Sequence, residues 1–220
     1  MKIEIWSDVV CPWCYIGKRR LEAAVARFDH GNEVELTYRS FELDPDAPRR
    51  EEQSLEEMLA RKYGMSREEA IAANARITEL ASGEGLEYRL DRAKRGNSFD
   101  AHRLIHLAAG HGLQSAMKER LMRAYFTEGE AIGEPAVLIR LAREVGIDEE
   151  EAREIVAGDA FAAEVRNDEA KAQALGISGV PFFVIEGQWG ISGAQPVELF
   201  LNALNQTWEE LRVGERPSTQ

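Results

Sequence analysis

The chain carries only two cysteines, Cys11 and Cys14, and they stand where a predicted strand meets a predicted helix. Residues 3–7 alternate between apolar and polar side chains and include two isoleucines, a pattern typical of a strand. Pro12 suits the first turn of a helix, where its missing N–H costs nothing. The Cys11-Pro12-Trp13-Cys14 motif therefore lies at a strand-to-helix junction, which places the first thiol at a helix N-terminus.

That position favours thiolate chemistry at Cys11. A helix N-terminus offers unpaired N–H groups and the positive end of the helix dipole, and both stabilise a thiolate. We expect Cys11 to have an exposed sulfur and to attack a substrate disulfide. Cys14 lies one turn later, should be more buried, and is expected to resolve the mixed disulfide. Pro12 and Trp13, between the thiols, are expected to contact the substrate.

A metal-binding interpretation of this cysteine pair is weaker. Two cysteines are too few for a structural zinc site unless histidines join them. His102 and His106 lie one helical turn apart, but no thiol or carboxylate clearly accompanies them, so we expect no metal. A disulfide across two residues closes a very short loop and adds little stability, so the pair is expected to serve reactivity.

The hydrophobic pattern indicates a sheet that is interrupted by a helical insertion. A helix from Pro12 and a strand over 34–41 complete a β-α-β opening. The chain closes with strands over 181–185 and 189–191, a helix over 196–211 and a frayed tail from Gly214. Between them, helical periodicity predicts segments near 51–63, 66–82, 98–110, 114–127, 135–145, 148–157 and 159–175, with a short extended candidate at 86–90. We expect Gly31 and Asn32 to end the first helix. We place a sheet domain at 1–44 and 176–220, and a helical insertion domain at 45–175.

A second motif, residues 176–183, precedes the closing hairpin. Pro181 stands at the start of a strand after a glycine-containing turn, which makes the Val180–Pro181 bond a candidate cis peptide. We expect Pro181 to pack beside Cys11. A cis bond would turn the Val180 backbone toward an extended peptide or glutathione.

Charge excludes some classes of partner. The formal net charge of −12 argues against nucleic acid and anionic membrane surfaces, because both require a basic face. No basic and apolar leader is evident at the N-terminus and no apolar run approaches membrane-spanning length, so we expect a cytoplasmic protein. The densest basic stretch contains Arg89, Arg92, Lys94 and Arg95, and it fits either a solvated loop or a site for an acidic ligand group.

The sequence resembles the DsbA family of thioredoxin-like proteins, and within it the FrnE-like branch, which is related to 2-hydroxychromene-2-carboxylate isomerases and kappa-class glutathione transferases. Residues 6–17, 97–104 and 179–183 carry the resemblance, which covers nearly the whole chain. It implies an α/β, thioredoxin-like fold with a large inserted all-helical domain, Cys11 as nucleophile and Pro181 in cis. The isomerase and transferase relatives typically lack the second cysteine, so the presence of Cys14 favours dithiol chemistry.

Two enzymatic functions follow from these motifs. The first is a thiol–disulfide oxidoreductase, a reductase or isomerase, that acts on a disulfide-containing protein or low-molecular-weight thiol and requires no cofactor, with glutathione as a candidate co-substrate. The second is a glutathione-dependent isomerase or transferase acting on a small aromatic molecule. A homodimer is compatible with either. A third hypothesis is a non-enzymatic module that binds a protein through its helical insertion.

Three polar residues have two interpretations each. Asp8 either assists proton transfer from Cys14 or only fixes the turn after the first strand. Asn97 either faces the substrate groove, as the resemblance suggests, or caps the helix that follows it. His102 either binds substrate or is a buried structural histidine.

Overall fold

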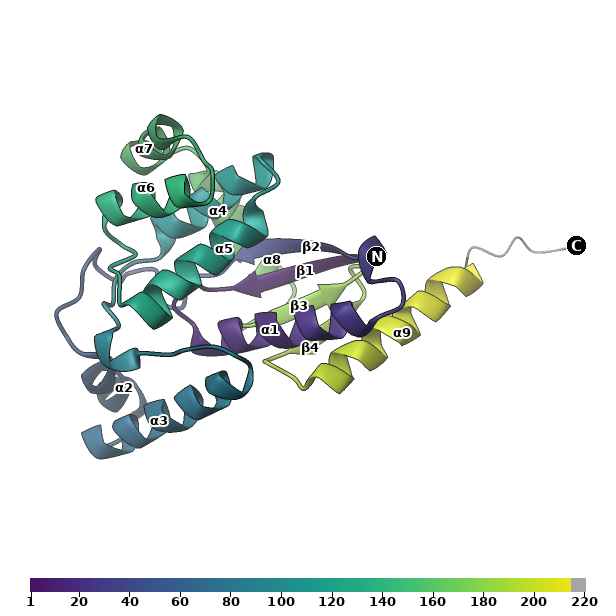
Figure 1. Ribbon diagram of the computed structural model, residues 1–220, viewed down its shortest axis with the longest axis horizontal. Coiled ribbons are helices and arrows are strands. Elements are labelled where there is room, and N and C mark those ends of the chain that lie inside the picture. Colours follow the sequence, from purple (N-terminus) through teal and green to yellow (C-terminus); the bar gives the residue numbers. More distant parts are fainter. Residues whose placement is uncertain (215–220) are drawn as a thin grey trace, which may run out of the picture.

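The computed structural model describes residues 1–214, so the tail expected from Gly214 lies almost entirely outside the described residues. Within them the strands form a four-stranded sheet in the order β2-β1-β3-β4 (Figure 1). The strands are β1 (Lys2–Ser7), β2 (Glu35–Ser40), β3 (Phe182–Ile185) and β4 (Trp189–Ser192). β1 pairs parallel with β2 and antiparallel with β3, so the two ends of the chain build one sheet.

Alternation along β1 assigns its side chains to two layers. Ile3 and Ile5 enter the large core that contains Phe200, whereas Trp6 joins a smaller cluster with Ala172 and Val184. Because side chains alternate across a strand and β1 carries apolar residues on both faces, helices cover both faces of the sheet.

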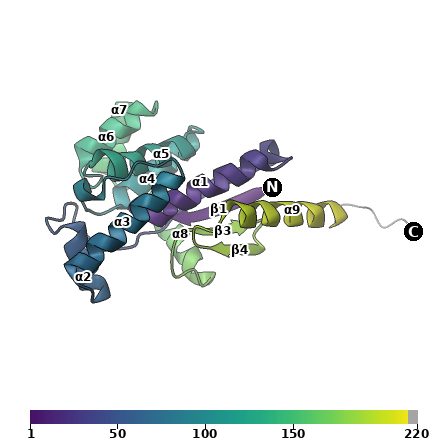
Figure 2. The same cartoon turned by 60° about the horizontal axis from the view of Figure 1, so that its bottom comes forward.

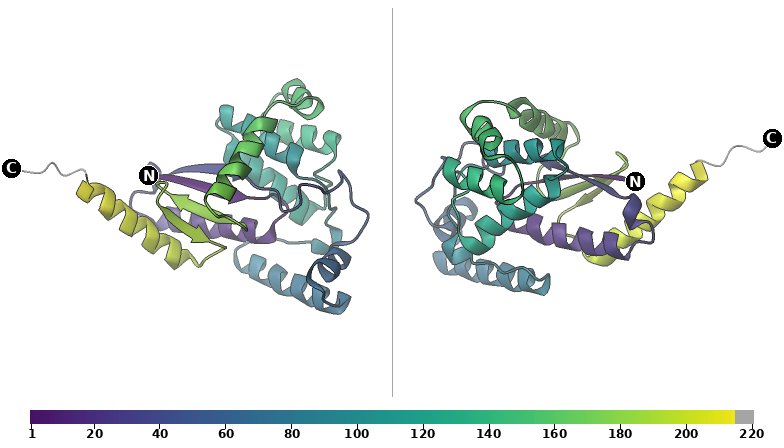
Figure 3. Two further views of the ribbon diagram at one scale, coloured as in Figure 1. Left: turned by 180° about the vertical axis from the view of Figure 1, so that it is seen from behind. Right: turned by 45° about the horizontal axis from the view of Figure 1, so that its top comes forward.

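Helices α1 (Pro12–Arg27) and α9 (Val197–Gly214) cover one face, and α8 (Ala162–Ala174) covers the other. The views from behind and after a 60° turn show this arrangement (Figures 2 and 3). On the α9 side, the Phe183 and Phe200 rings meet edge to face at 4.7 Å. On the α8 side, the Trp6 indole donates a hydrogen bond of 2.9 Å to the Asp168 carbonyl.

The remaining helices form two groups beside the sheet (Figure 1). The first is a hairpin of α2 (Leu55–Tyr63) and α3 (Arg67–Gly83), in which capping boxes at Ser54 and Ser66 begin the helices. Gly64 ends α2 at φ 64°, a conformation that favours glycine. The second group contains α4 (Phe99–Gly110), α5 (Gln114–Arg123), α6 (Pro135–Glu144) and α7 (Glu149–Ala157).

The division into a sheet domain and a helical domain stays a prediction, and one helix bears on where its boundary falls. α8 belongs by sequence to the segment 45–175, yet its Asp168 carboxylate accepts the Ser40 amide of β2 at 2.9 Å. A single hydrophobic core also runs from β1 through α1 into α4, α5 and α6. The inserted helices therefore share their interior with the sheet.

Four boundaries differ from the sequence expectation. No strand forms at 86–90; the segment is a loop that ends in a 3₁₀ turn, Leu90–Arg92. The helix expected over 114–127 stops at Arg123 and continues as a π turn, Ala124–Glu128. α2 begins only at Leu55, because Ser54 and Glu57 cap it there. α1 ends at Arg27, and the glycine at position 31 begins a separate 3₁₀ turn, Gly31–Glu33.

Candidate active site

The two thiols lie at the start of α1, with Cys11 as its N-cap residue and Pro12 in its first turn. Both cysteines are free thiols, and the Cys14 amide donates to the Cys11 carbonyl at 3.0 Å. The expectation of an exposed Cys11 sulfur is wrong, because this residue is only 4 % exposed. Residues distant in sequence cover it, so the thiol is reached through a cavity.

One covering segment is the loop before β3. The Val180–Pro181 peptide bond is cis, and the Cys11 thiol donates to the Val180 carbonyl at 3.6 Å across 169 positions of sequence. Pro181 is buried against Gly17 of α1. The loop that was expected to lie beside the first thiol is therefore in contact with it.

Cys14 is 2 % exposed, and burial raises the pKa of its thiol well above the ordinary value. The neighbouring Cys11 sulfur raises this pKa further, while the charge of Lys118 opposes the effect. A thiol with a raised pKa stays protonated at neutral pH and is a poor nucleophile. The surroundings therefore differentiate the two cysteines and leave Cys11 as the better candidate for attack.

Lys118 of α5 is completely buried behind the cysteines, a position that sequence reasoning missed. Its ammonium donates to the Ser7 carbonyl at 2.9 Å and lies 5.9 Å from the centre of the Tyr38 ring. Burial lowers the pKa of Lys118 to about 8, against the opposing influence of Cys14, Asp8 and Cys11. A buried ammonium at this place adds positive charge beside the thiols.

Asp8 has no exposed surface, and its contacts match the turn-fixing interpretation. Its carboxylate accepts from the Leu43 amide at 2.8 Å and from His102 Nε2 at 3.3 Å. Burial alone raises the pKa of Asp8, but His102, the Leu43 amide and Lys118 together outweigh it, so the pKa is lowered. Asp8 thus fastens the turn after β1 to the chain that follows β2.

Two residues expected to contact substrate do not line the cavity. His102 is 1 % exposed, and burial lowers its pKa, so it is a neutral partner of Asp8. Asn97 donates to the Pro45 carbonyl at 3.1 Å and accepts from the Phe99 amide at 2.8 Å, so it anchors the loop and pairs with the first amide of α4, whose N-cap residue is Ser98. His106 pairs with Asp168, and among the described residues no cluster of three metal-ligating side chains occurs.

The cavity beside Cys11 has a volume of about 960 Å³. The motif contributes Cys11, Pro12 and Trp13, the loop before β3 contributes Val180, and the α2–α3 hairpin contributes a further set of lining residues. Trp13 is 43 % exposed at its rim. A cavity of this size lies within the range of sites that bind small molecules.

Aromatic side chains from the inserted segment lie beside the motif. The Tyr88 hydroxyl donates to the Pro12 carbonyl at 2.7 Å, and its ring stacks on Phe126 at 4.7 Å. Phe126 and Tyr125 also line the cavity. The sequence pattern had placed Tyr88 in a strand, so its contact with the motif could not be anticipated from local periodicity.

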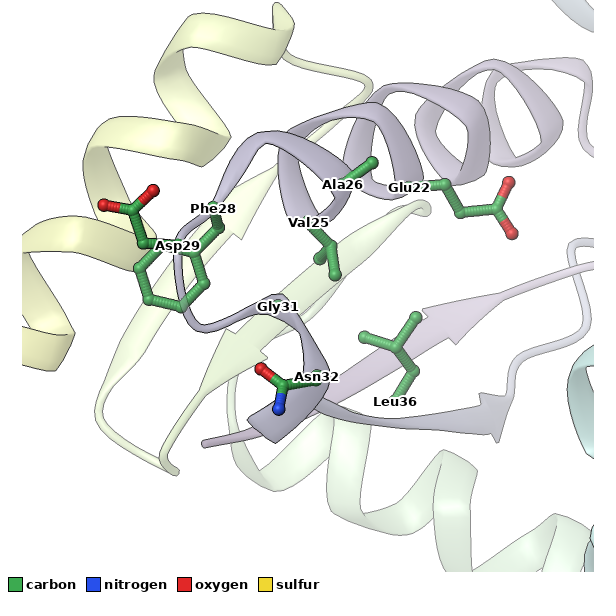
Figure 4. Close-up of a pocket in the computed structure, with 8 residues that line it drawn as sticks. All are labelled: Glu22, Val25, Ala26, Phe28, Asp29, Gly31, Asn32 and Leu36. Carbon is green, nitrogen blue, oxygen red and sulfur yellow. The ribbon is translucent and has the colours of Figure 1, made fainter.

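A second hollow, of about 410 Å³, lies at the far end of α1 (Figure 4). Its lining includes Glu22, Val25, Asp29 and Leu36. Neither cysteine reaches it, and it presents two carboxylates and no cation, so it offers no thiol chemistry. The cavity at Cys11 is the candidate active site.

Comparison with known proteins places this geometry in a family. Residues 2–205 match the DSBA-like thioredoxin domain. The chain belongs to this family. It is an enzyme of the DsbA-like thiol–disulfide oxidoreductase class, with a thioredoxin fold and an inserted set of helices.

Solved structures of related proteins share the DsbA-like fold. A probable DsbA oxidoreductase from Streptomyces coelicolor is 44 % identical, with a TM-score of 0.92 over 100 % of this chain and 93 % of that one. The cytosolic disulfide reductase DsbM from Pseudomonas aeruginosa, solved with GSH, is 20 % identical, with a TM-score of 0.67 over 95 % and 100 %. A 2-hydroxychromene-2-carboxylate isomerase is 12 % identical, with a TM-score of 0.72 over 98 % and 100 %. These last two likenesses show the fold alone.

A glycine of the DsbA-like α1 helix allows the loop before β3 to approach the thiols. A Cβ atom added at Gly17 would lie 3.0 Å from Pro181 Cγ and 3.2 Å from Phe183 Cζ. We expect Gly17→Val to lower the free energy of unfolding by about 1–3 kcal/mol, because overpacking forces its neighbours apart. Gly83→Val is the control, since a Cβ there meets nothing within 4 Å. Urea unfolding checks both, and equal losses would contradict the packing argument.

Proposed function

We propose that the protein reduces or isomerises disulfides through Cys11 and Cys14, in a reducing compartment such as the cytoplasm. The observation that carries the proposal is the asymmetry of the pair: Cys11 lines the cavity, whereas Cys14 does not and its pKa is raised by burial. A nucleophile that reaches substrate and a protected second thiol are the two groups that disulfide exchange requires.

The proposed reaction has two steps. The Cys11 thiolate attacks one sulfur of a substrate disulfide, forms a mixed disulfide, and releases the other sulfur as a thiolate that takes up a proton. Cys14 then loses its proton and attacks the Cys11 sulfur, which releases the second substrate thiol and leaves a Cys11–Cys14 disulfide. An external dithiol or two glutathione molecules return the enzyme to the dithiol form. Pro12, Trp13 and Val180 flank the reacting sulfur from the cavity side.

A glutathione-dependent isomerase or transferase is the second candidate. The aromatic lining of the cavity favours it, with Trp13, Tyr63 and Phe126 available to contact a small aromatic substrate. In that mechanism Cys11 would activate glutathione and Cys14 would have no chemical task. A variant of Cys14 therefore distinguishes the two candidate functions.

The reduction potential of the cysteine pair tests the leading proposal. We expect the pair to equilibrate reversibly with glutathione buffers, at a potential more reducing than the value of about −120 mV that characterises periplasmic DsbA. The reason is that Trp13 brings no ionisable charge to stabilise the Cys11 thiolate. Thiol counting across a series of reduced to oxidised glutathione ratios measures the potential. A pair that does not oxidise reversibly, or one near −120 mV, contradicts the proposal.

A further inference from the structure

The charge of the active-site cavity is opposite to that of the protein. The chain as a whole has a formal net charge of −12. The cavity lining nevertheless contains four cations, Arg61, Lys62, Arg76 and Arg95, against the two carboxylates Asp44 and Glu51. A concave, partly apolar surface with a net charge of one sign attracts ligands with a charge of the opposite sign.

Among the described residues these four cations form no ion pair, and the one side-chain contact recorded for them is that of the Lys62 ammonium, 5.9 Å from the centre of the Tyr63 ring. Most arginines of the chain pair with acidic side chains; Arg89 and Arg92, for example, have acidic neighbours at 3.8–4.0 Å. In contrast, among residues 1–212, whose side chains are described, no carboxylate lies within 4.0 Å of the four cations that line the cavity. Their charge is therefore available to a ligand.

Arg95 gives the most specific indication. One of its guanidinium nitrogens, Nη1, is buried and has no hydrogen-bond partner among the described residues. Its backbone is fixed, because the Arg95 carbonyl accepts from the Glu51 amide at 3.0 Å. A buried donor without an acceptor is costly, and the planar guanidinium suits a carboxylate. An anionic ligand group that reached this nitrogen from the cavity would supply the missing acceptor.

Most of the remaining lining is apolar or aromatic, and Asn74 adds one amide side chain. Leu55, Met58, Ile77 and Leu80 of the α2–α3 hairpin line the cavity together with Phe126. The volume of about 960 Å³ accommodates a small molecule. The cavity thus combines a thiol, an apolar wall and an unpartnered guanidinium.

We infer that the preferred substrate of Cys11 is a small disulfide with a carboxylate on an apolar or aromatic body. The carboxylate binds at Arg95, with Arg76 and the two cations of α2 contributing long-range attraction, and the disulfide bond lies at the Cys11 sulfur. This inference rests on the proposed function and adds the substrate class. The exchange step is unchanged: Cys11 bonds to one substrate sulfur, and the other leaves as a carboxylate-bearing thiolate.

Three small disulfides of different charge test the inference. They are the dianionic aromatic 5,5′-dithiobis(2-nitrobenzoate), the neutral aromatic 2,2′-dithiodipyridine and the cationic cystamine. Single-turnover rates with the reduced full-length protein are divided by the rates of a free dithiol, to remove differences in intrinsic reactivity. We expect the normalised rate to be highest for the dianion and lowest for the cation, with the preference reduced by added salt.

Variants assign the preference to Arg95. Arg95→Met is expected to lower the normalised rate with the dianion about tenfold or more, the loss expected for a hydrogen bond to a charged group, and to change the neutral disulfide less than about twofold. Arg92→Met is the control, because it removes the same charge from the same stretch outside the cavity. If Arg95→Met does not fold, Arg76→Met is compared with Arg67→Met, both at exposed positions of α3, of which only the first lines the cavity.

The outcomes separate this inference from the proposed function. Efficient exchange with all three disulfides and no charge preference overturns the substrate class but leaves disulfide exchange intact. Equal effects of Arg95→Met and Arg92→Met also overturn it. No exchange with any of the three disulfides overturns the proposed function itself.

Discussion

Replacement of Cys11 by serine is expected to abolish catalysed disulfide reduction, and replacement of Cys14 by serine is expected to stop it after the first step. Cys11 is the thiol that lines the cavity, so its hydroxyl analogue leaves no nucleophile there. In Cys14→Ser the first attack still occurs, but no internal thiol releases the bound substrate. Insulin reduction by dithiothreitol gives the steady-state rate, and a stopped-flow trace with a chromogenic disulfide gives the first step.

The comparison of these two variants also decides between the candidate functions. Cys11→Ser should show neither a burst nor turnover above the rate with dithiothreitol alone. Cys14→Ser should show a full burst of one equivalent and slow turnover that depends on external thiol. An undiminished steady-state rate in Cys14→Ser would instead support the glutathione-dependent mechanism, in which Cys14 has no chemical task.

The second large effect concerns stability, and it comes from Lys118. The pKa of this buried ammonium is about 8, compared with 10.5 for an exposed lysine. Below pH 8 both the folded and the unfolded chain hold the proton, so the folded state bears the full cost of burying the charge. Between pH 8 and 10.5 the unfolded chain binds more protons than the folded one, so the free energy of unfolding rises with pH. The gain amounts to about 3 kcal/mol across this interval.

Urea unfolding between pH 7 and 10.5 measures this linkage. The parent is Cys11→Ser/Cys14→Ser, in which thiol titration makes no contribution, and the test variant adds Lys118→Met. We expect the free energy of unfolding of the parent to rise by about 3 kcal/mol or more relative to that of the variant as the pH rises to 10.5, because the two serines remove the thiols that raise the pKa of Lys118. Lys62→Met in the same background removes an exposed lysine and should follow the parent at every pH. A constant difference between the parent and Lys118→Met would show that the lysine is not buried as a charged group.

The framework of the fold is predictable from the sequence because its signals are local. The alternation over 3–7, the helix start at Pro12 and the hairpin near 182–192 each depend on neighbouring residues, and the sheet forms from them. The position of α8 is different. Its Asp168 meets the Ser40 amide across 128 positions of sequence, and no local pattern encodes such a contact.

The site shows the same division between local and distant determinants. The motif itself is local, and so is its place at a helix N-terminus. The burial of Cys11 depends on Val180, which is 169 positions away, and the thiol environment depends on Lys118, which belongs to another helix. The sequence alone could not tell which residues of the basic stretch are solvated and which face a ligand site. In the structure, Arg92 points to solvent beside Asp91, whereas Arg95 lines the cavity.

The sequence contains no apolar run that approaches membrane-spanning length, and the part of the chain that the structure describes agrees with this. Over residues 1–214 no helix is both long and apolar enough to cross a bilayer. The cytoplasmic location remains a proposal, and so does the use of glutathione. Both depend on which thiols return the Cys11–Cys14 pair to its reduced form.

Mass-spectrometric mapping of the mixed disulfide shows which of the two thiols attacks the substrate. The Cys14→Ser variant is incubated with a chromogenic aromatic disulfide at neutral pH, digested under acid conditions without reductant, and compared with Cys11→Ser treated in the same way. We expect one substrate adduct per chain, on the peptide that contains Cys11, and a nearly unlabelled Cys11→Ser protein, because the Cys14 thiol is buried with a raised pKa. Equal or faster labelling of Cys14 in the Cys11→Ser protein would contradict the assignment of Cys11 as the attacking thiol.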